Sequence, residues 1–169
     1  MKKLSLIFIS ILFLFKSFSA YSYSSDPKMF IDELIVEATN KLSDKNLNKD
    51  EKFNFIKKMA LENVDINALG LYTLGELRKI TDQNTLDKYQ QSFENYFLKS
   101  LTSRLSDYSS NKFEIIDAEK KSSNYTIVKT KIVESNNQQE IKINWRVYTK
   151  NSDKPLIRDL IVEGLSLAR

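Results

Sequence analysis

Side chains that could do chemistry are plentiful in this sequence, but two of the most versatile types are missing. The 169 residues contain neither histidine nor cysteine. Their absence removes the commonest general base, the commonest thiol nucleophile and the usual ligands of zinc. A carboxylate pair or a Ser/Lys dyad stays open, although no spacing among these residues stands out. We therefore expect no catalytic residue, no metal site and no cofactor.

One acidic run has part of the spacing of a calcium-binding loop. Oxygen-bearing side chains stand at positions one, three, five and seven of an EF-hand pattern, at Asp44, Asn46, Asn48 and Asp50. The pattern then requires glycine at position six and glutamate at position twelve, where this chain has Lys49 and Phe55. Because both positions shape such a loop, we interpret the run as a solvated loop that ends in a helix cap.

The N-terminus has the organisation of a secretory signal peptide. Lys2 and Lys3 form a basic start, a mainly apolar run follows from residue 4 to 15, and small residues come next at cleavage spacing. The apolar run covers roughly 18 Å as a helix, well short of the ~30 Å hydrocarbon layer of a membrane. We expect residues 1–19 to be removed on export, with no lipoprotein anchor because no cysteine follows, and residues 20–169 to form one domain.

The net charge depends on this expected cleavage. The chain has 26 basic and 22 acidic residues and a net charge of +4. Three of the basic residues and none of the acidic ones fall within residues 1–19, so 23 basic residues face 22 acidic ones in the expected mature chain. A nearly neutral chain with interleaved charges disfavours nucleic acid as a partner. Its length is sufficient to bury a core without disulfides.

Helical periodicity marks the first half of the expected domain. Asp26 followed by Pro27 predicts a helix start, and Asn48 with Glu51 three residues later predicts another. A short, turn-rich piece containing Gly70 and Gly75 should come next. Thr81 is then expected to cap the longest helix, Asp82–Tyr108, whose apolar stripe is unusually aromatic.

The second half changes to a period of two, which is typical of strands. Four strands are predicted, at Phe113–Ala118, Tyr125–Val133, Ile141–Thr149 and Leu156–Leu165. Helices followed by consecutive strands favour an α+β fold. We expect N-terminal helices packed on a bent antiparallel sheet of about four strands, in a cone-like shape that could enclose an apolar cavity.

Short motifs recur along the chain in a recognisable order. They are Pro27-x-x-Phe30-Ile31, Asp65, Leu74-Gly75-x-x-Arg78, Thr81, the spaced residues Phe93, Tyr96, Leu105 and Tyr108, and Arg158-Asp159-Leu160-x-x-Glu163-Gly164-x-Ser166-Leu167. This order resembles the MlaC family of periplasmic phospholipid-binding proteins, also known for toluene tolerance. It covers nearly all of the expected mature chain.

Three departures accompany the resemblance. Leu77 stands where the family usually has tryptophan, and Leu101 stands where an aromatic residue is common. The family also continues into a C-terminal helix, whereas this sequence ends at Arg169. We expect either a fragment or a domain that lacks one element covering its core.

The resemblance implies a carrier in the periplasm, with phospholipid as its cargo. Such a carrier passes lipid between an outer-membrane lipoprotein complex and an inner-membrane ABC transporter complex with its lipid-binding subunit, and so maintains outer-membrane asymmetry. The alternatives are an exported protein with a filled core that docks to membrane complexes, and a small enzyme on the same scaffold.

Tail-binding residues should be apolar and should come from both layers of the fold. On the helical side we expect Leu74, Leu77, Phe93, Phe97 and Leu101, and on the sheet Ile143, Trp145, Val147 and Ile161. Any single aromatic residue could equally belong to an ordinary core, because periodicity does not separate a packed core from a lined pocket. We expect Arg78, Asp159 and Glu163 to hold the architecture by pairing and turn formation.

Overall fold

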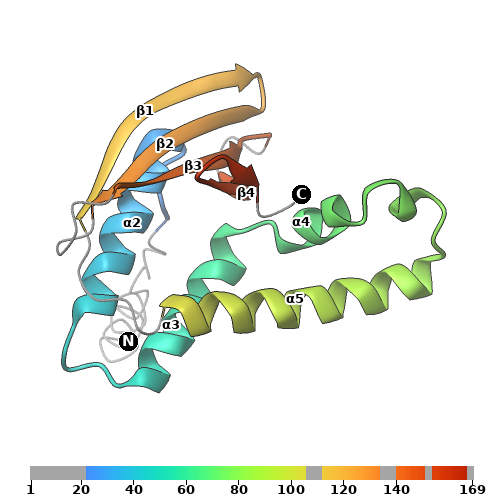
Figure 1. Cartoon of the computed structure of the whole chain (residues 1–169), viewed down its shortest axis with the longest axis horizontal. Coiled ribbons are helices and arrows are strands. Elements are labelled where there is room, and N and C mark those ends of the chain that lie inside the picture. Colours follow the sequence, from blue (N-terminus) through green and yellow to red (C-terminus); the bar gives the residue numbers. More distant parts are fainter. Residues whose placement is uncertain (1–21, 106–111, 134–139, 151–153, 167–169) are drawn as a thin grey trace, which may run out of the picture.

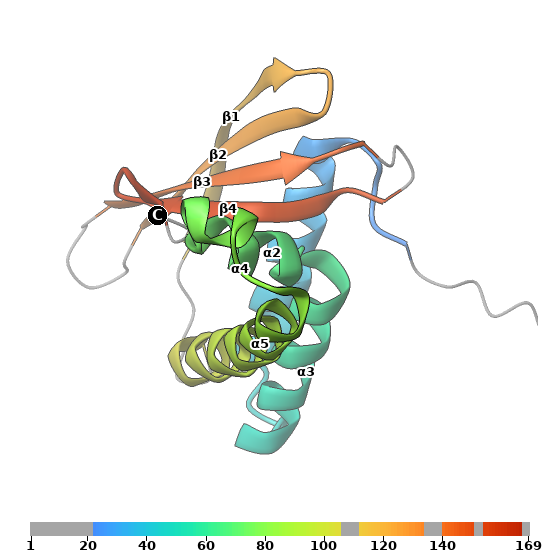
Figure 2. The same ribbon diagram turned by 90° about the vertical axis from the view of Figure 1, so that its right-hand side faces the viewer.

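Among the residues that the structure describes, helices cover one face of a single antiparallel sheet and leave its other face free of helices (Figures 1 and 2). The computed structural model describes residues 22–105, 112–133, 140–150 and 154–166. The expected signal peptide, residues 1–19, and the expected end of the longest helix at residue 108 lie outside these ranges. The α+β fold expected from the sequence is confirmed.

The helices begin at side chains that satisfy free backbone N–H groups. Their bounds are α2 Pro27–Ser43, α3 Lys49–Asn63, α4 Ile66–Thr73, the 3-10 helix η1 Gly75–Lys79 and α5 Gln83–Leu105. Asp26 accepts from the backbone N–H groups of Lys28 and Met29, and Asn48 forms a reciprocal capping box with Glu51. Both predicted starts are confirmed.

The start of α5 differs from the prediction by one residue. Asp82 caps this helix, because its Oδ1 accepts from Thr85 N–H at 3.0 Å. This hydrogen bond lowers the pKa of the Asp82 carboxyl. Thr81 instead donates its hydroxyl to the Leu77 carbonyl at 2.7 Å and so belongs to the preceding turn.

In the described part of the chain, five strands follow one another in sequence order across the sheet. Their bounds are β1 Lys112–Ser122, β2 Tyr125–Val133, β3 Glu140–Tyr148, β4 Leu156–Val162 and β5 Leu165–Ser166. The predicted last strand divides in two because Glu163 and Gly164 have φ angles of 50° and 83° and form a two-residue turn. Among the described residues the sheet therefore has five strands where about four were expected.

Antiparallel pairing arranges the inward-facing side chains in four rows that cross the sheet. In order along the strands, the rows are Phe113, Ile132 and Ile141; Ile115, Thr130, Ile143 and Val162; Ala118, Val128, Trp145 and Leu160; and Lys120, Thr126, Val147 and Ile157. Apolar residues dominate the first three rows, and the fourth becomes polar toward β1. This numbering of the rows is kept below.

Two β-bulges change which side chains face the helices. In β4 the bulge falls at Arg158, between the pairs Arg146 with Asp159 and Val147 with Ile157. In β1 another bulge falls at Ile116, which is 54% exposed. A bulge inserts one extra residue, so the side chains beyond it change faces.

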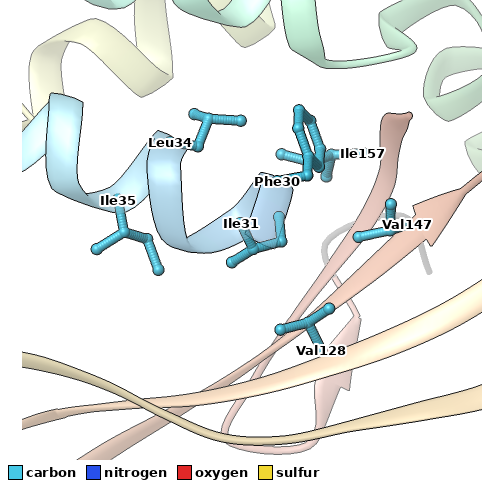
Figure 3. Close-up of a cluster of buried hydrophobic side chains, with 7 residues drawn as sticks. All are labelled: Phe30, Ile31, Leu34, Ile35, Val128, Val147 and Ile157. Carbon is cyan, nitrogen blue, oxygen red and sulfur yellow. The ribbon is translucent and has the colours of Figure 1, made fainter. Parts of the chain in front are cut away.

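The closed part of the core lies where the first turns of α2 meet the centre of the sheet. Figure 3 shows Phe30 and Ile31 of α2 against Val128 of β2, Val147 of β3 and Ile157 of β4. Phe30, Ile31, Val128 and Val147 are at most 1% exposed. This cluster fills one end of the space between the layers.

Candidate functional site

An apolar cavity of about 320 Å³ lies beside this core, between the helices and the inner face of the sheet. Its sheet side is lined by Phe113, Ile132, Ile143, Trp145, Ile157, Leu160 and Val162. Its helical side is lined by Leu34, Ile35, Ala38, Thr39, Leu42, Phe55, Ile56, Met59, Ala60, Asn63, Val64, Phe97, Leu101 and Leu105. A cavity with this lining offers many interchangeable contacts to hydrocarbon and few to polar groups.

Helical spacing explains how α5 contributes to the wall. Phe97, Leu101 and Leu105 recur every four residues and therefore share one face of the helix. Phe93, four residues before Phe97, stacks on the Phe97 ring with ring centres 6.2 Å apart, but packs against α4. The aromatic stripe of α5 thus divides between a packed helix contact and the cavity.

Polar groups near the wall have hydrogen bonds inside the protein. Trp145 Nε1 donates to Thr130 Oγ1 at 2.9 Å, and Thr130 Oγ1 donates to the Ile143 carbonyl at 3.1 Å. Asn63 Nδ2 donates to the Met59 carbonyl at 3.0 Å. Buried polar groups without partners are costly, so these bonds let the surrounding wall remain apolar.

The comparisons with known proteins agree with this geometry. The family model described as MlaC protein matches residues 28–169. The chain belongs to the MlaC family. A phospholipid-binding protein from Ralstonia solanacearum, solved in complex with a phospholipid, has a similar fold with a TM-score of 0.69 and 11% identity. The alignment covers 85% of this chain and 81% of that one. No curated protein matches the sequence.

Four of the nine residues predicted for this MlaC-family site line the cavity. They are Phe97 and Leu101 from α5, and Ile143 and Trp145 from β3. The alternation along β3 and the stripe on α5 placed them on the correct faces. Since burial and lining are geometric observations, their role in binding lipid stays a prediction.

The other five predicted residues lie elsewhere. Val147 belongs to the closed core, and Ile161 lies on the outer face because the bulge at Arg158 shifts the alternation. Leu74 is the C-cap residue that follows α4, and Leu77 on η1 is 57% exposed. Phe93 packs against Gly70, as described above.

Sequence reasoning missed the contribution of α2 and α3. Leu34, Ile35, Ile56 and Met59 line the cavity at helical spacing, but they were not among the residues predicted for the site. On β4 the lining residues are Ile157 before the bulge and Leu160 and Val162 after it, and only the position of the bulge reveals the last two. The cavity is therefore enclosed by more helices than expected.

A polar clamp joins the helical layer to β4 beside the cavity. Arg158 Nε donates to Asp65 Oδ2 at 2.8 Å, and Arg158 Nη1 donates to Tyr125 Oη at 3.1 Å. The guanidinium carbon also lies 3.5 Å from the centre of the Tyr148 ring. Asp65 N–H donates to the Ile157 carbonyl at 2.9 Å, so backbone and side chains fix the same junction.

The residues expected to hold the architecture make structural contacts. Arg78 Nη1 donates to the Leu71 carbonyl at 3.4 Å. Asp159 Oδ2 accepts from Ser166 at 2.7 Å and lies 3.7 Å from Arg146 Nη1, while its Oδ1 is buried without a hydrogen-bond partner in the described part of the chain. Glu163 forms the turn between β4 and β5 and accepts from the Lys142 backbone N–H.

Charged side chains gather on the outer face of the sheet, away from the cavity. Lys131 pairs with Glu114 and Glu140, and Lys129 pairs with Asp117 and Glu119. Hydrogen bonds to these lysines lower the pKa of Glu114 and Asp117. Within the described ranges no cluster of acidic residues could hold a metal ion.

Proposed function

We propose that this MlaC-family protein is a periplasmic phospholipid carrier that shields the tails of its cargo in the cavity. The observation that carries the proposal is the apolar cavity between the helices and the sheet. The family assignment and the phospholipid found in the structurally similar Ralstonia protein support it. The role is one of binding and transport, without catalysis.

The energetics of lipid transfer suit such a cavity. Burying a methylene is worth about 0.8 kcal/mol. The two tails of a phospholipid, with about 30 methylenes in total, are therefore roughly 24 kcal/mol less stable in water than in an apolar environment. A carrier needs only to match the apolar environment of a membrane. Lipid can then enter and leave with a small change in free energy. Since the wall has few polar groups to bind the headgroup, the headgroup can remain in water.

The cellular role that we propose is exchange between two membranes. The carrier would receive or deliver lipid at an outer-membrane lipoprotein complex and at an inner-membrane ABC transporter complex with its lipid-binding subunit. The signal-peptide pattern of residues 1–19 supports export to the periplasm. Across the described residues, no helix is sufficiently long and apolar to cross a membrane.

Native mass spectrometry tests the carrier role. The mature protein would be purified from a diderm host, and any bound molecule would be extracted with solvent. We expect an added mass near one phospholipid per chain. Leu101→Gln, in the cavity wall, should reduce lipid occupancy at least several-fold, whereas Leu77→Gln, the same change at an exposed site, should leave it unchanged.

The opposite result would contradict the proposal. A folded wild-type protein that carries no lipid, and takes none from phospholipid vesicles, would favour an exported docking protein whose core needs no cargo. Equal occupancy in folded Leu101→Gln and wild type would instead place the lipid outside this cavity.

A further inference from the structure

We infer that Trp145, held in place by Thr130, forms the inner wall of the cavity and thereby limits the length of the lipid tail that fits. The inference rests on the proposed function, because it concerns the cargo of the same cavity. It assigns one residue a role in selecting among lipids.

The rows of the sheet locate this wall. Trp145 lies in the third row, between Val128 on β2 and Leu160 on β4. Leu160 lines the cavity, whereas Val128 is fully buried in the closed core. Within the third row, Trp145 therefore separates the cavity on the side of Leu160 from the packed core on the side of Val128. On β4 the cavity continues to Ile157 in the fourth row.

The hydrogen bond of the indole shows in which direction the ring lies. Trp145 Nε1 donates to Thr130, which is on the neighbouring strand and one row away. The ring thus reaches diagonally across the sheet toward β2. Thr130 is 0% exposed and does not line the cavity, although Ile143 beside it in the second row does. The indole covers Thr130 and separates it from the cavity.

The same hydrogen bonds make the wall rigid. If the indole turned into the cavity, its N–H would lose its partner in apolar surroundings. Thr130 is itself fixed, because its hydroxyl donates to the Ile143 carbonyl within the sheet. A lipid tail that reaches Trp145 must therefore stop or bend toward β4. There, Ile157 of the fourth row lines the last part of the cavity and packs with the first turns of α2.

The experiment measures which tail lengths the protein selects. Delipidated wild type and variants would be equilibrated with vesicles that contain phosphatidylethanolamines of graded tail length, and the bound lipid would be identified by native mass spectrometry. Trp145→Leu should shift the bound population toward longer tails. A shift of about two carbons is expected, since each methylene fills about the volume of one water, roughly 30 Å³, and the smaller side chain frees space for about two of them.

Three further variants separate an effect of the wall on tail selection from a general loss of stability. Thr130→Val removes the acceptor of the indole N–H but keeps the shape of the side chain, and should produce a smaller shift in the same direction. Trp145→Phe keeps an aromatic ring without the N–H, and supplies a milder change if Trp145→Leu does not fold. Ile161→Ala, on the outer face of β4, is the control and should keep the wild-type distribution.

The outcomes distinguish this inference from the proposed function. Folded Trp145 variants that carry lipid with the wild-type distribution of tail lengths would overturn the inference and leave the carrier role intact. A wild-type protein that takes no lipid from any vesicle would remove the carrier role and this inference with it. A shift in Ile161→Ala equal to that in Trp145→Leu would also overturn the inference, because tail selection would then not depend on the wall.

Discussion

At the scale of single residues, hydrogen bonds inside the protein keep polar atoms from disturbing an apolar wall. Thr130 serves both as the acceptor of the Trp145 indole and as a donor to the Ile143 carbonyl. Asn63 directs its amide to the carbonyl one helical turn earlier. Each hydrogen bond joins neighbouring groups, and together these bonds leave an apolar space between the layers that suits hydrocarbon.

Gly70 is a residue whose lack of a side chain matters. A Cβ atom at this position would lie 2.9 Å from Cδ1 and 3.1 Å from Cγ of the Phe93 ring. Gly70→Ala should lower the free energy of unfolding by about 1–2 kcal/mol, because overpacking outweighs the gain in helix propensity. Chemical denaturation measures the change. Combining it with Phe93→Leu should recover part of the loss, and a fully additive double variant would contradict the steric explanation.

The ion pairs of the lysines on the outer face lead to a prediction about the titration of Glu114. Lys131 lies 3.3 Å from Glu114, and its hydrogen bond is the main cause of the lowered pKa of that carboxyl. Lys131→Met should raise the pKa of Glu114 toward its ordinary value, as measured by NMR titration. Lys121→Met, on the neighbouring pair with Glu119, is a matched control that should leave Glu114 unchanged.

The sign of the linked change in stability follows from the lowered pKa. A carboxyl whose pKa is lowered by folding contributes stability above the pKa of the unfolded chain, about 4.3 for Glu. That contribution is lost as the pH falls through the folded-state value. The difference in stability between wild type and Lys131→Met should therefore be present at neutral pH and shrink below about pH 4. A difference that grows on acidification would contradict this assignment.

The site residues that were predicted correctly lie in strands or helices that have no irregularity before them. Ile143 and Trp145 follow unbroken alternation, and Phe97 and Leu101 follow one helical stripe. Ile161 was placed on the inner face because a bulge has no distinct sequence pattern here. Periodicity reports which side of an element is apolar, but the distance between two layers decides whether that side meets another side chain or a cavity.

At the scale of elements, the sequence was most informative where a helix begins with a local hydrogen bond. Asp26 and the pair Asn48 and Glu51 act within one turn, so their roles could be read directly from the chain. The division of the last strand was missed because Glu163 adopts a positive φ, which is uncommon for a residue with a side chain. The order of strands was simpler, because successive hairpins place neighbours in sequence beside one another.

The clamp between α4 and β4 gives a prediction at this scale. Asp65 both caps α4 by accepting from Ala68 N–H and accepts from Arg158. Asp65→Asn keeps a capping group but loses the charged acceptor, and should cost about 1 kcal/mol of stability. Asp65→Ala loses both interactions and should cost about 2–3 kcal/mol. Equal costs in denaturant unfolding would show that the two roles are not separable.

At the scale of the whole molecule, one layer of helices and one sheet enclose a cavity and a closed core side by side. The closed core at the first turns of α2 stabilises the fold, while the cavity leaves the adjacent part of both layers incompletely packed. Incomplete packing lowers stability, because the lining side chains lose contacts that a filled core would supply. A ligand that fills the cavity should restore them.

Thermal unfolding of the delipidated protein tests this expectation. Lipid present at 100 times its dissociation constant should stabilise the folded state by about 2.7 kcal/mol. For a domain of this size, that corresponds to a rise in Tm of roughly 5–10 °C. Leu101→Gln should show a much smaller rise, and an unchanged Tm in wild type across increasing lipid concentrations would contradict the expected filling.

The bulge at Ile116 has a consequence for behaviour at high concentration. Among the described residues β1 has a partner strand on one side only, so an edge of 11 residues presents backbone donors and acceptors. Such edges recruit strands from other chains and start aggregation. The bulge interrupts the edge, and Lys112, Glu114 and Asp117 add charge along it. The bulge in β1 therefore disfavours pairing of this edge with strands of other chains, and so opposes aggregation. A straight and uncharged edge strand would not.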